Sequence, residues 1–156
     1  MTQTQANSFL PMLRELVRCY QAFELYSSSH IRGMGFTSAQ FDIIATLGDT
    51  PGMTFKELGE QTLITKGTLT GVVDRLEDKG LVKRVALPQD GRCSVVMLTR
   101  AGEREFKRVF LPHLDHMGKA FGKVRAADLD ALGVKLRKLR SVFENSAGSA
   151  AKSEEA

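Results

Sequence analysis

The sequence predicts a mainly α-helical chain with one small β-hairpin, on three observations. Apolar residues recur at steps of three and four over several segments, which is the spacing of one buried helix face. Residues 81–98 instead contain two runs of β-branched and apolar residues around a polar turn, a pattern typical of a hairpin. The chain has 156 residues, 42% of them hydrophobic, so it is long enough to enclose a core.

Three helices are predicted in the first part of the chain. Residues 8–32 form the first, because apolar side chains share one face and Gly33 and Gly35 follow. Thr37 and Thr54 begin the second and third, since each is followed three residues later by Gln or Glu in the pattern of a capping box. Gly48 ends the second helix.

A fourth helix is predicted from Thr65, a good N-cap residue, to Lys79, with Gly80 in the left-handed position that ends it. Strands at 81–85 and 94–98, joined by a turn at 88–92, follow it. Two short helices, a turn and a hairpin over residues 54–99 predict a winged helix-turn-helix.

Two further helices are predicted towards the C-terminus. One begins at Thr99, and Pro112 within it is expected to kink or interrupt it. The other covers about 127–143, where apolar residues at steps of three and four form a seam for a partner helix. Residues 145–156 are small and polar, so a disordered tail is expected.

The helix over residues 65–79 has the two faces that a DNA-contacting helix needs. Its inward face is formed by Leu69, Val72, Val73 and Leu76. The opposite face carries Lys66, Thr70, Gly71 and Arg75, and backbone amides at the helix N-terminus attract phosphate. Residues 64–100 carry a surplus of three positive charges, most of the net +4 of the chain, which would neutralise phosphates.

Gly67 and Gly71 lie inside this helix, where each costs about 1 kcal/mol relative to alanine. Two explanations are open: close approach of the helix backbone to DNA, or tight packing against the preceding helix. The hairpin tip carries Arg92, which can enter a minor groove. Asp90 can pair with Arg92 or with Arg75, although such a pair can also be an ordinary surface ion pair.

The segments LTGVVDRLEDKGLV at 69–82, DGR at 90–92 and VMLT at 96–99, in this order and spacing, resemble the multiple antibiotic resistance regulator (MarR) family. The resemblance covers about residues 8–144 and implies a homodimer whose winged lobes bind a pseudo-palindromic operator. It implies DNA-binding roles for Thr65, Lys66, Thr68, Thr70, Arg75, Asp90 and Arg92. Gly71 departs from the family, because several members carry a larger polar residue there.

We therefore expect one winged-helix domain over residues 1–144, with a DNA-binding lobe at about 37–99 and dimerisation helices at about 8–32 and 100–144. The 129–143 seam and Phe106, Phe110, Leu114 and Met117 would be buried between protomers. One intramolecular helical bundle is the alternative.

The resemblance also implies a small effector, aromatic or anionic, bound between the dimer arms and the DNA lobes. Tyr26, His30 and Arg32 are the candidate pocket residues. A redox-sensing regulator of the same fold, acting through Cys19 or Cys93, is the alternative. His113 and His116 could share a metal, but two ligands do not make a site, so no metal or cofactor is expected.

The expected function is thus a DNA-binding transcriptional regulator, a homodimeric repressor released by its effector. An enzyme is not expected, because no Ser/His/Asp set and no Gly-rich phosphate loop stand out. A winged-helix module that binds protein instead of DNA is the other alternative, and the basic face of residues 65–79 argues against it. No leader and no apolar run long enough to cross a bilayer are found, so a cytoplasmic protein without a membrane partner is expected.

Overall fold

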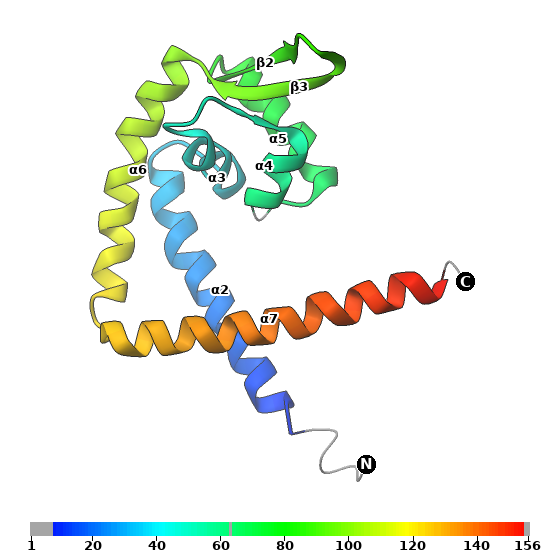
Figure 1. The fold of residues 1–156 in the computed structure, drawn as a ribbon. Coiled ribbons are helices and arrows are strands. Elements are labelled where there is room, and N and C mark those ends of the chain that lie inside the picture. The colour runs from blue at the N-terminus through cyan, green and yellow to red at the C-terminus, as the bar shows by residue number, and fades with distance from the viewer. Residues whose placement is uncertain (1–7, 63, 155–156) are drawn as a thin grey trace. The chain divides into compact units, whose positions relative to one another are not determined.

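The computed structural model describes residues 8–62 and 64–154, which form two compact units that meet between His116 and Met117. The mainly helical prediction with one hairpin is confirmed. The elements (Figure 1) are α2 (Leu10–Gly33), α3 (Ser38–Leu47), β1 (Met53–Thr54), α4 (Phe55–Gln61), α5 (Lys66–Asp78), β2 (Val82–Leu87), β3 (Asp90–Leu98), α6 (Arg100–Phe121) and α7 (Ala126–Glu154). Helix α6 begins in the first unit and ends in the second, and α7 belongs to the second.

The helix ends in the first unit follow from their caps. Thr37 Oγ1 accepts a hydrogen bond from the Gln40 N–H at 3.2 Å, and Gln40 Oε1 accepts one from the Thr37 N–H at 3.1 Å. Thr54 and Glu57 form the same reciprocal pair at 3.2 and 2.8 Å. Both capping boxes were predicted and both are confirmed, as is the left-handed Gly80 after α5, with φ +70°.

The sheet has three antiparallel strands in the order β1-β3-β2, one more than the sequence predicts. Leu87 pairs with Asp90, so the turn is shorter than expected. Strand β1 is only two residues long and carries no periodicity to recognise. Gly52, with φ +102°, turns the chain onto β3, where an added Cβ would lie 2.8 Å from the Val96 carbonyl oxygen.

The core of the first unit lies between the sheet and helices α3, α4 and α5 (Figure 1). The predicted inward face of α5 is confirmed, because all four of its residues are at most 3% exposed. Phe106 is buried in this same core and stacks on Phe110, with ring centroids 4.9 Å apart. The expectation that Phe106 is buried between protomers is therefore wrong, since its own lobe covers it.

The start of α6 is fastened to the base of the hairpin. Thr99 Oγ1 accepts from the Gly102 N–H at 3.1 Å and donates to the Gly80 carbonyl at 2.6 Å. The Thr99 N–H donates to the Leu81 carbonyl oxygen at 3.0 Å. A Cβ on Gly102 would lie 2.0 Å from that same oxygen, so only glycine permits this approach of two backbones.

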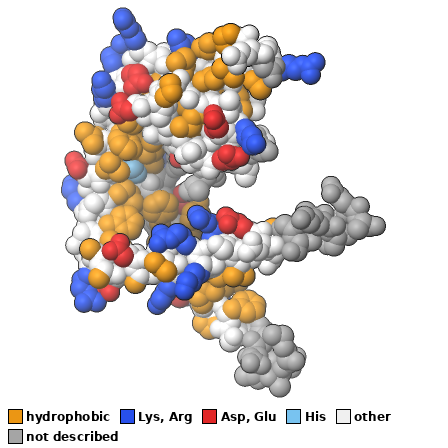
Figure 2. All heavy atoms as spheres, viewed as in Figure 1, with side chains coloured by type: hydrophobic (Ala, Val, Ile, Leu, Met, Phe, Trp, Pro, Cys, Tyr) orange, Lys and Arg blue, Asp and Glu red, His pale blue; other side chains and the backbone are white. Residues whose placement is uncertain are grey.

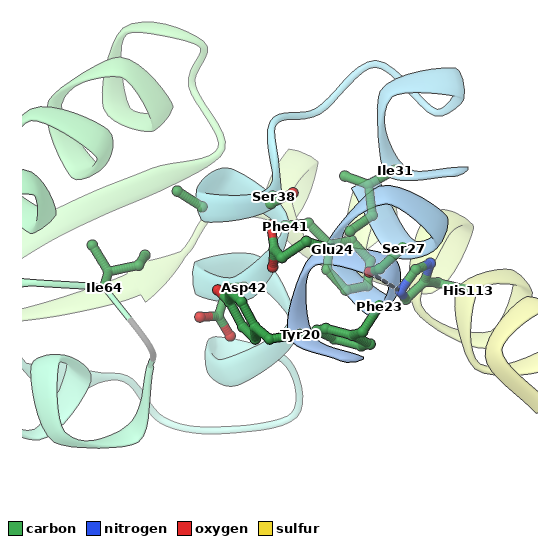
Figure 3. A pocket seen from close by; sticks show the side chains of 11 residues that line it. Tyr20, Phe23, Glu24, Ser27, Ile31, Ser38, Phe41, Asp42, Ile64 and His113 are labelled. Atoms are coloured by element: carbon green, nitrogen blue, oxygen red, sulfur yellow. Dashed lines mark hydrogen bonds between the residues drawn. The ribbon is translucent and has the colours of Figure 1, made fainter. Parts of the chain in front are cut away.

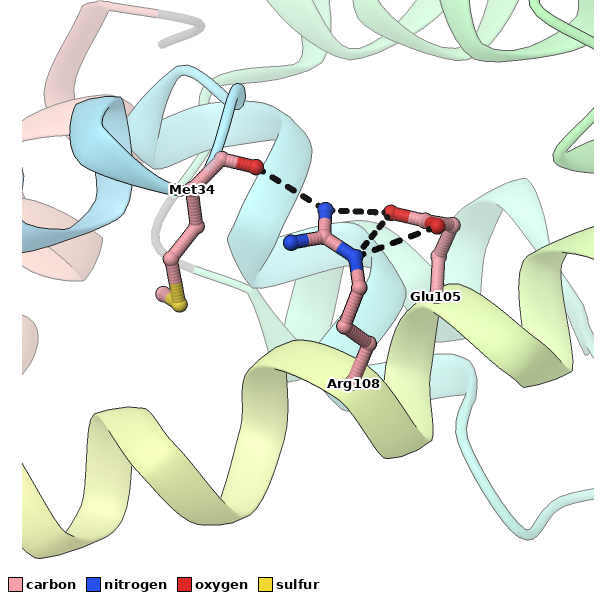
Figure 4. Close-up of polar contacts among 3 residues, drawn as sticks. All are labelled: Met34, Glu105 and Arg108. Carbon is pink, nitrogen blue, oxygen red and sulfur yellow. Dashed lines mark hydrogen bonds and ion pairs between the residues drawn. The ribbon is translucent and has the colours of Figure 1, made fainter.

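Arg108 joins α6 to the turn after α2 (Figure 4). A guanidinium N–H donates to the Met34 carbonyl at 2.9 Å, and Nε–H donates to Glu105 Oε2 at 3.0 Å. The hydrogen bond from Arg108 lowers the pKa of Glu105 below its ordinary value. The guanidinium also lies 5.9 Å from the centroid of the Phe36 ring. Arg108 therefore holds α6 against the turn that follows α2.

The C-terminal helices differ from the prediction in two respects. Helix α6 continues through Pro112 without interruption, because the remaining hydrogen bonds of a long helix offset the one that proline cannot donate. Helix α7 continues to Glu154, so the segment expected to be a tail is helical as far as that residue. Its Ala, Lys and Glu residues are good helix formers, which explains the extension.

Candidate functional site

The outward face of α5 is lined by glycines along the first half of the helix. Gly67, Gly71, Asp74 and Asp78 are spaced so that they follow one line, opposite the buried face. A Cβ added at either glycine would meet nothing within 4 Å. Tight packing against α4 is therefore wrong as an explanation of these glycines, and an open surface for close approach is what the lobe presents.

The N-terminus of α5 carries the predicted threonines. Thr65 is the N-cap residue, as expected, but its side chain accepts no hydrogen bond from a backbone N–H. Its hydroxyl pairs instead with that of Thr68 at 3.2 Å. Thr68 and Thr70 are exposed, and the side chain of Lys66 lies outside the described residues. The helix N-terminus thus has a surface of small hydroxyl groups.

Arg84, in β2, occupies a position that the sequence did not single out. It forms ion pairs with Asp74 and, at 3.7 Å, with Glu77, both on α5. Its guanidinium also lies 5.3 Å from the centroid of the Phe55 ring. Arg84 therefore ties the hairpin to α5, so the positive surplus counted from the sequence is partly engaged within the lobe. Arg75, in contrast, is exposed on the flank of α5.

The tip of the hairpin presents the second predicted contact. Arg92 and Cys93 are exposed on β3, just after the turn at residues 88–89. The side chain of Asp90 lies outside the described residues, so its pairing with Arg92 or Arg75 stays a prediction. Cys19, the other candidate thiol, is exposed on α2.

A pocket of about 300 Å³ opens in the first unit between α2 and α3 (Figure 3). Side chains converge on it from α2 and α3, with one from α6 and one from the segment before α5. Its lining comprises Tyr20, Phe23, Glu24, Ser27, Ile31, Ser38, Ala39, Phe41, Asp42, Ile64 and His113. Tyr26, His30 and Arg32 are not among these residues; Arg32 instead donates to Ser28 Oγ at 3.3 Å.

All three histidines of the chain gather at the junction of α2 and α6, although they are far apart in sequence. His30 Nδ1 lies 3.1 Å from His113 Nδ1, and His30 stacks on His116 with ring centroids 4.1 Å apart. Tyr26 stacks on the His116 ring, also at 4.1 Å. Ser27 Oγ lies 3.2 Å from His113 Nε2. Within the described residues, no group of three side chains is placed to hold a metal ion.

Burial lowers the pKa of His113 below its ordinary value, and positive charge on His30 or His116 would lower it further. The unfolded chain takes up a proton on this ring as pH falls through about 6.5, whereas the folded chain does so only at lower pH. We therefore expect the free energy of unfolding to be undiminished above about pH 6.5 and to fall below it. Urea unfolding from about pH 8 to pH 5 measures this slope. The variant His113→Gln should flatten the slope, and an unchanged slope would contradict the assignment.

Comparison with known proteins bears on this geometry. A model of the MarR family matches residues 36–94, which run from the turn before α3 into β3. The HTH-type transcriptional regulator MhqR of Bacillus subtilis is 31% identical over 101 residues, which cover 63% of this chain and 68% of that protein. The chain belongs to the MarR family. It is a DNA-binding transcriptional regulator with a winged-helix fold, and not an enzyme.

Two solved MarR-type structures resemble it over most of their length. A mutant MarR of Escherichia coli, complexed with operator DNA, is 25% identical with a TM-score of 0.75, covering 85% of this chain and 96% of that one. BpsR of Bordetella bronchiseptica, whose DNA binding is regulated by 6-hydroxynicotinic acid, is 26% identical with a TM-score of 0.73, covering 86% and 94%.

This MarR-family chain exposes large apolar side chains on α2, α6 and α7, and Figure 2 draws hydrophobic side chains in orange. On α2 they include Met12, Val17 and Tyr20, each at least 44% exposed, and on α6 they include Leu111 and Leu114, each at least 48% exposed. On α7 they include Leu132, Leu136 and Phe143, each at least 43% exposed. In the part of the chain that is described, no helix is both long and apolar enough to span a membrane.

Proposed function

We propose that the chain acts as a homodimeric repressor that binds a pseudo-palindromic operator and leaves it when a small molecule binds. The observation that carries this proposal is the open first half of α5, together with the exposed Arg92 on the hairpin. A Cβ added at Gly67 or Gly71 would have no neighbour within 4 Å. A helix and a protruding hairpin can contact a major groove and the adjacent minor groove together.

In this proposal the N-terminal half of α5 enters the major groove. Thr65, Lys66, Thr68 and Thr70 lie in that half and contact bases or phosphates. Arg75, on the flank, contacts phosphate. Asp78 lies at the other end of the helix, where its charge disfavours approach to phosphate, so α5 enters with its N-terminus foremost.

Dimerisation is supported by the exposed apolar faces. Monomeric soluble proteins seldom expose large contiguous apolar patches, and helices α2, α6 and α7 each carry at least three exposed large apolar side chains. A two-fold interface would bury them and would place two copies of α5 on successive turns of a duplex.

The pocket between α2 and α3 is the proposed effector site. Ile64, which lines it, is the residue before the N-cap of α5. A ligand that packs against Ile64 in only one position of this segment would shift the population of α5 positions. BpsR, regulated by 6-hydroxynicotinic acid, is a relative in which a small molecule controls DNA binding.

Selection of bound duplexes from a random-sequence pool tests the function as a whole. We expect enrichment of a motif with two inverted half-sites about one helical turn apart, because a two-fold dimer presents two equivalent lobes. A motif with a single half-site would contradict the proposal that the chain binds DNA as a dimer. Absence of any enrichment would overturn DNA recognition and favour a module that binds protein.

The hairpin contact has its own test. Replacing Arg92 with alanine should weaken operator binding about tenfold and reduce the slope of log affinity against log salt by about one, because one phosphate-neutralising charge is lost. Gel-shift titrations over a salt series measure both quantities. Arg125→Ala removes an exposed arginine outside the winged lobe and is the matched control. If both variants show the same operator affinity and the same salt slope, Arg92 does not contribute to DNA binding.

A further inference from the structure

We infer that the pocket between α2 and α3 binds an organic cation, a protonated amine carried on a single aromatic ring, and that the Glu24 carboxylate holds its charge. This inference rests on the proposed function, because it names the class of effector for the same pocket. The sequence resemblance implies an aromatic or anionic effector; the ligand inferred here is aromatic and carries a positive charge.

Within the part of the chain that the structure describes, the Glu24 carboxylate has no cationic partner. It lines the pocket from α2 and is only partly exposed. No hydrogen bond or ion pair joins it to any other residue in the described part of the chain. Glu24 therefore offers a carboxylate on the pocket wall to a cation, and hydrogen bonds between charged groups are roughly twice as strong as those between neutral ones.

The walls around Glu24 suit a cationic ring. Tyr20, Phe23 and Phe41 supply aromatic surface, and the faces of such rings attract ammonium groups. Asp42 adds a second carboxylate to the lining, whatever else it contacts. Among the described lining residues there is no Lys or Arg, so a carboxylate ligand would meet the Glu24 carboxylate with no cationic side chain of the lining to attract it.

Two features of the pocket favour an anion, and each is weaker than the full charge of Glu24. Ser38 lies at the N-terminus of α3, whose dipole is equivalent to about half a positive charge. The capping box at Thr37 already supplies an acceptor to that terminus. His113 is buried, and its lowered pKa keeps the ring neutral near neutral pH. The net charge of the lining is therefore negative.

The size of the pocket limits the ligand. About 300 Å³ is at the lower end of the range for small-molecule sites, which suits one ring with a short chain. Because Ile64 forms part of the wall, the same ligand contacts the segment that leads into α5.

Calorimetric titration of the full chain with a matched pair of ligands tests the inference. Tyramine and para-hydroxyphenylacetate share the ring, the hydroxyl and a short chain, and they carry opposite charges. We expect tyramine to bind at least about tenfold more tightly, as the charged contact with Glu24 predicts. Equal or tighter binding of the anion overturns the proposal, and so does a lack of binding by tyramine, phenethylamine and benzylamine alike.

Variants at Glu24 identify the residue that carries the preference. Glu24→Gln should weaken tyramine binding roughly tenfold to a hundredfold, and Glu24→Arg should reverse the preference towards para-hydroxyphenylacetate. Glu15→Gln is the control, because Glu15 is on the same helix and exposed. If Glu24→Gln binds tyramine as wild type does, Glu24 is not the anchor and the proposal is wrong.

Gel shifts separate this inference from the function on which it rests. Wild type and Glu24→Gln should bind the selected operator equally, and tyramine should release only wild type. Operator binding without any preference for the amine would contradict the inferred cation site but not the proposed repressor function. Tyramine binding by a chain that binds no DNA would contradict the proposed repressor function but not the inferred cation site.

Discussion

Replacing Gly102 with alanine is expected to lower the free energy of unfolding by about 2–3 kcal/mol. The added Cβ would lie 2.0 Å from the Leu81 carbonyl oxygen, which accepts the Thr99 N–H. A flexible side chain could move aside, but this neighbour is backbone at the base of the hairpin. The gain in helix propensity from alanine, about 1 kcal/mol, is too small to compensate.

Thermal unfolding at fixed protomer concentration measures this effect. A loss of 2–3 kcal/mol corresponds to a fall in Tm of roughly 5–10 °C for a chain of this size. Gly118→Ala is the matched control on the same helix, because its Cβ would meet nothing within 4 Å. Gly118→Ala should leave the chain as stable as wild type or slightly more stable. Equal melting of the two variants would show that α6 can shift away from Leu81 at little cost.

Enlarging Gly71 is expected to separate folding from DNA binding. Alanine at this position gains up to about 1 kcal/mol of stability, because it removes a glycine from a helix and enters open space. Operator binding should weaken roughly tenfold with Gly71→Ala and roughly a hundredfold with Gly71→Leu, since each larger side chain moves the α5 backbone further from the groove.

Gel shifts and urea unfolding on the same preparations measure the two effects together. Gly118→Leu makes the same chemical change on α6 and should leave operator affinity unchanged. Full operator affinity in Gly71→Leu would mean that this line of α5 faces away from DNA. In that case the glycines would have no part in recognition.

Local signals in the sequence were enough to place most helix ends and the buried face of α5. The capping box at Thr37 was legible because its two partners are three residues apart, and the hairpin because its strands are consecutive. Strand β1 was not predictable, since its pairing depends on Gly52 and on a partner more than forty residues later. The helical extension of α7 to Glu154 was missed because small residues suit a tail and a helix equally.

The candidate site was predictable only where it is continuous in sequence. The exposed threonines of α5 lie on one helix and could be listed in advance. Arg84 could not be paired with Asp74 before the register of β2 against α5 was known. The pocket between α2 and α3 was not predicted, because its lining depends on which turns of α2 face α3 and on His113, which comes from a distant segment. The effector roles of Tyr26, His30 and Arg32 stay a prediction.

The ion pairs of Arg84 have a mechanical consequence. They couple β2 to the C-terminal half of α5, while Thr99 couples the chain just after α5 to the start of α6. Because both contacts tie the hairpin to α5, we expect the two to move together if the proposed effector displaces Ile64. Under the proposed function, one bound small molecule would then weaken the major-groove and the minor-groove contacts at the same time.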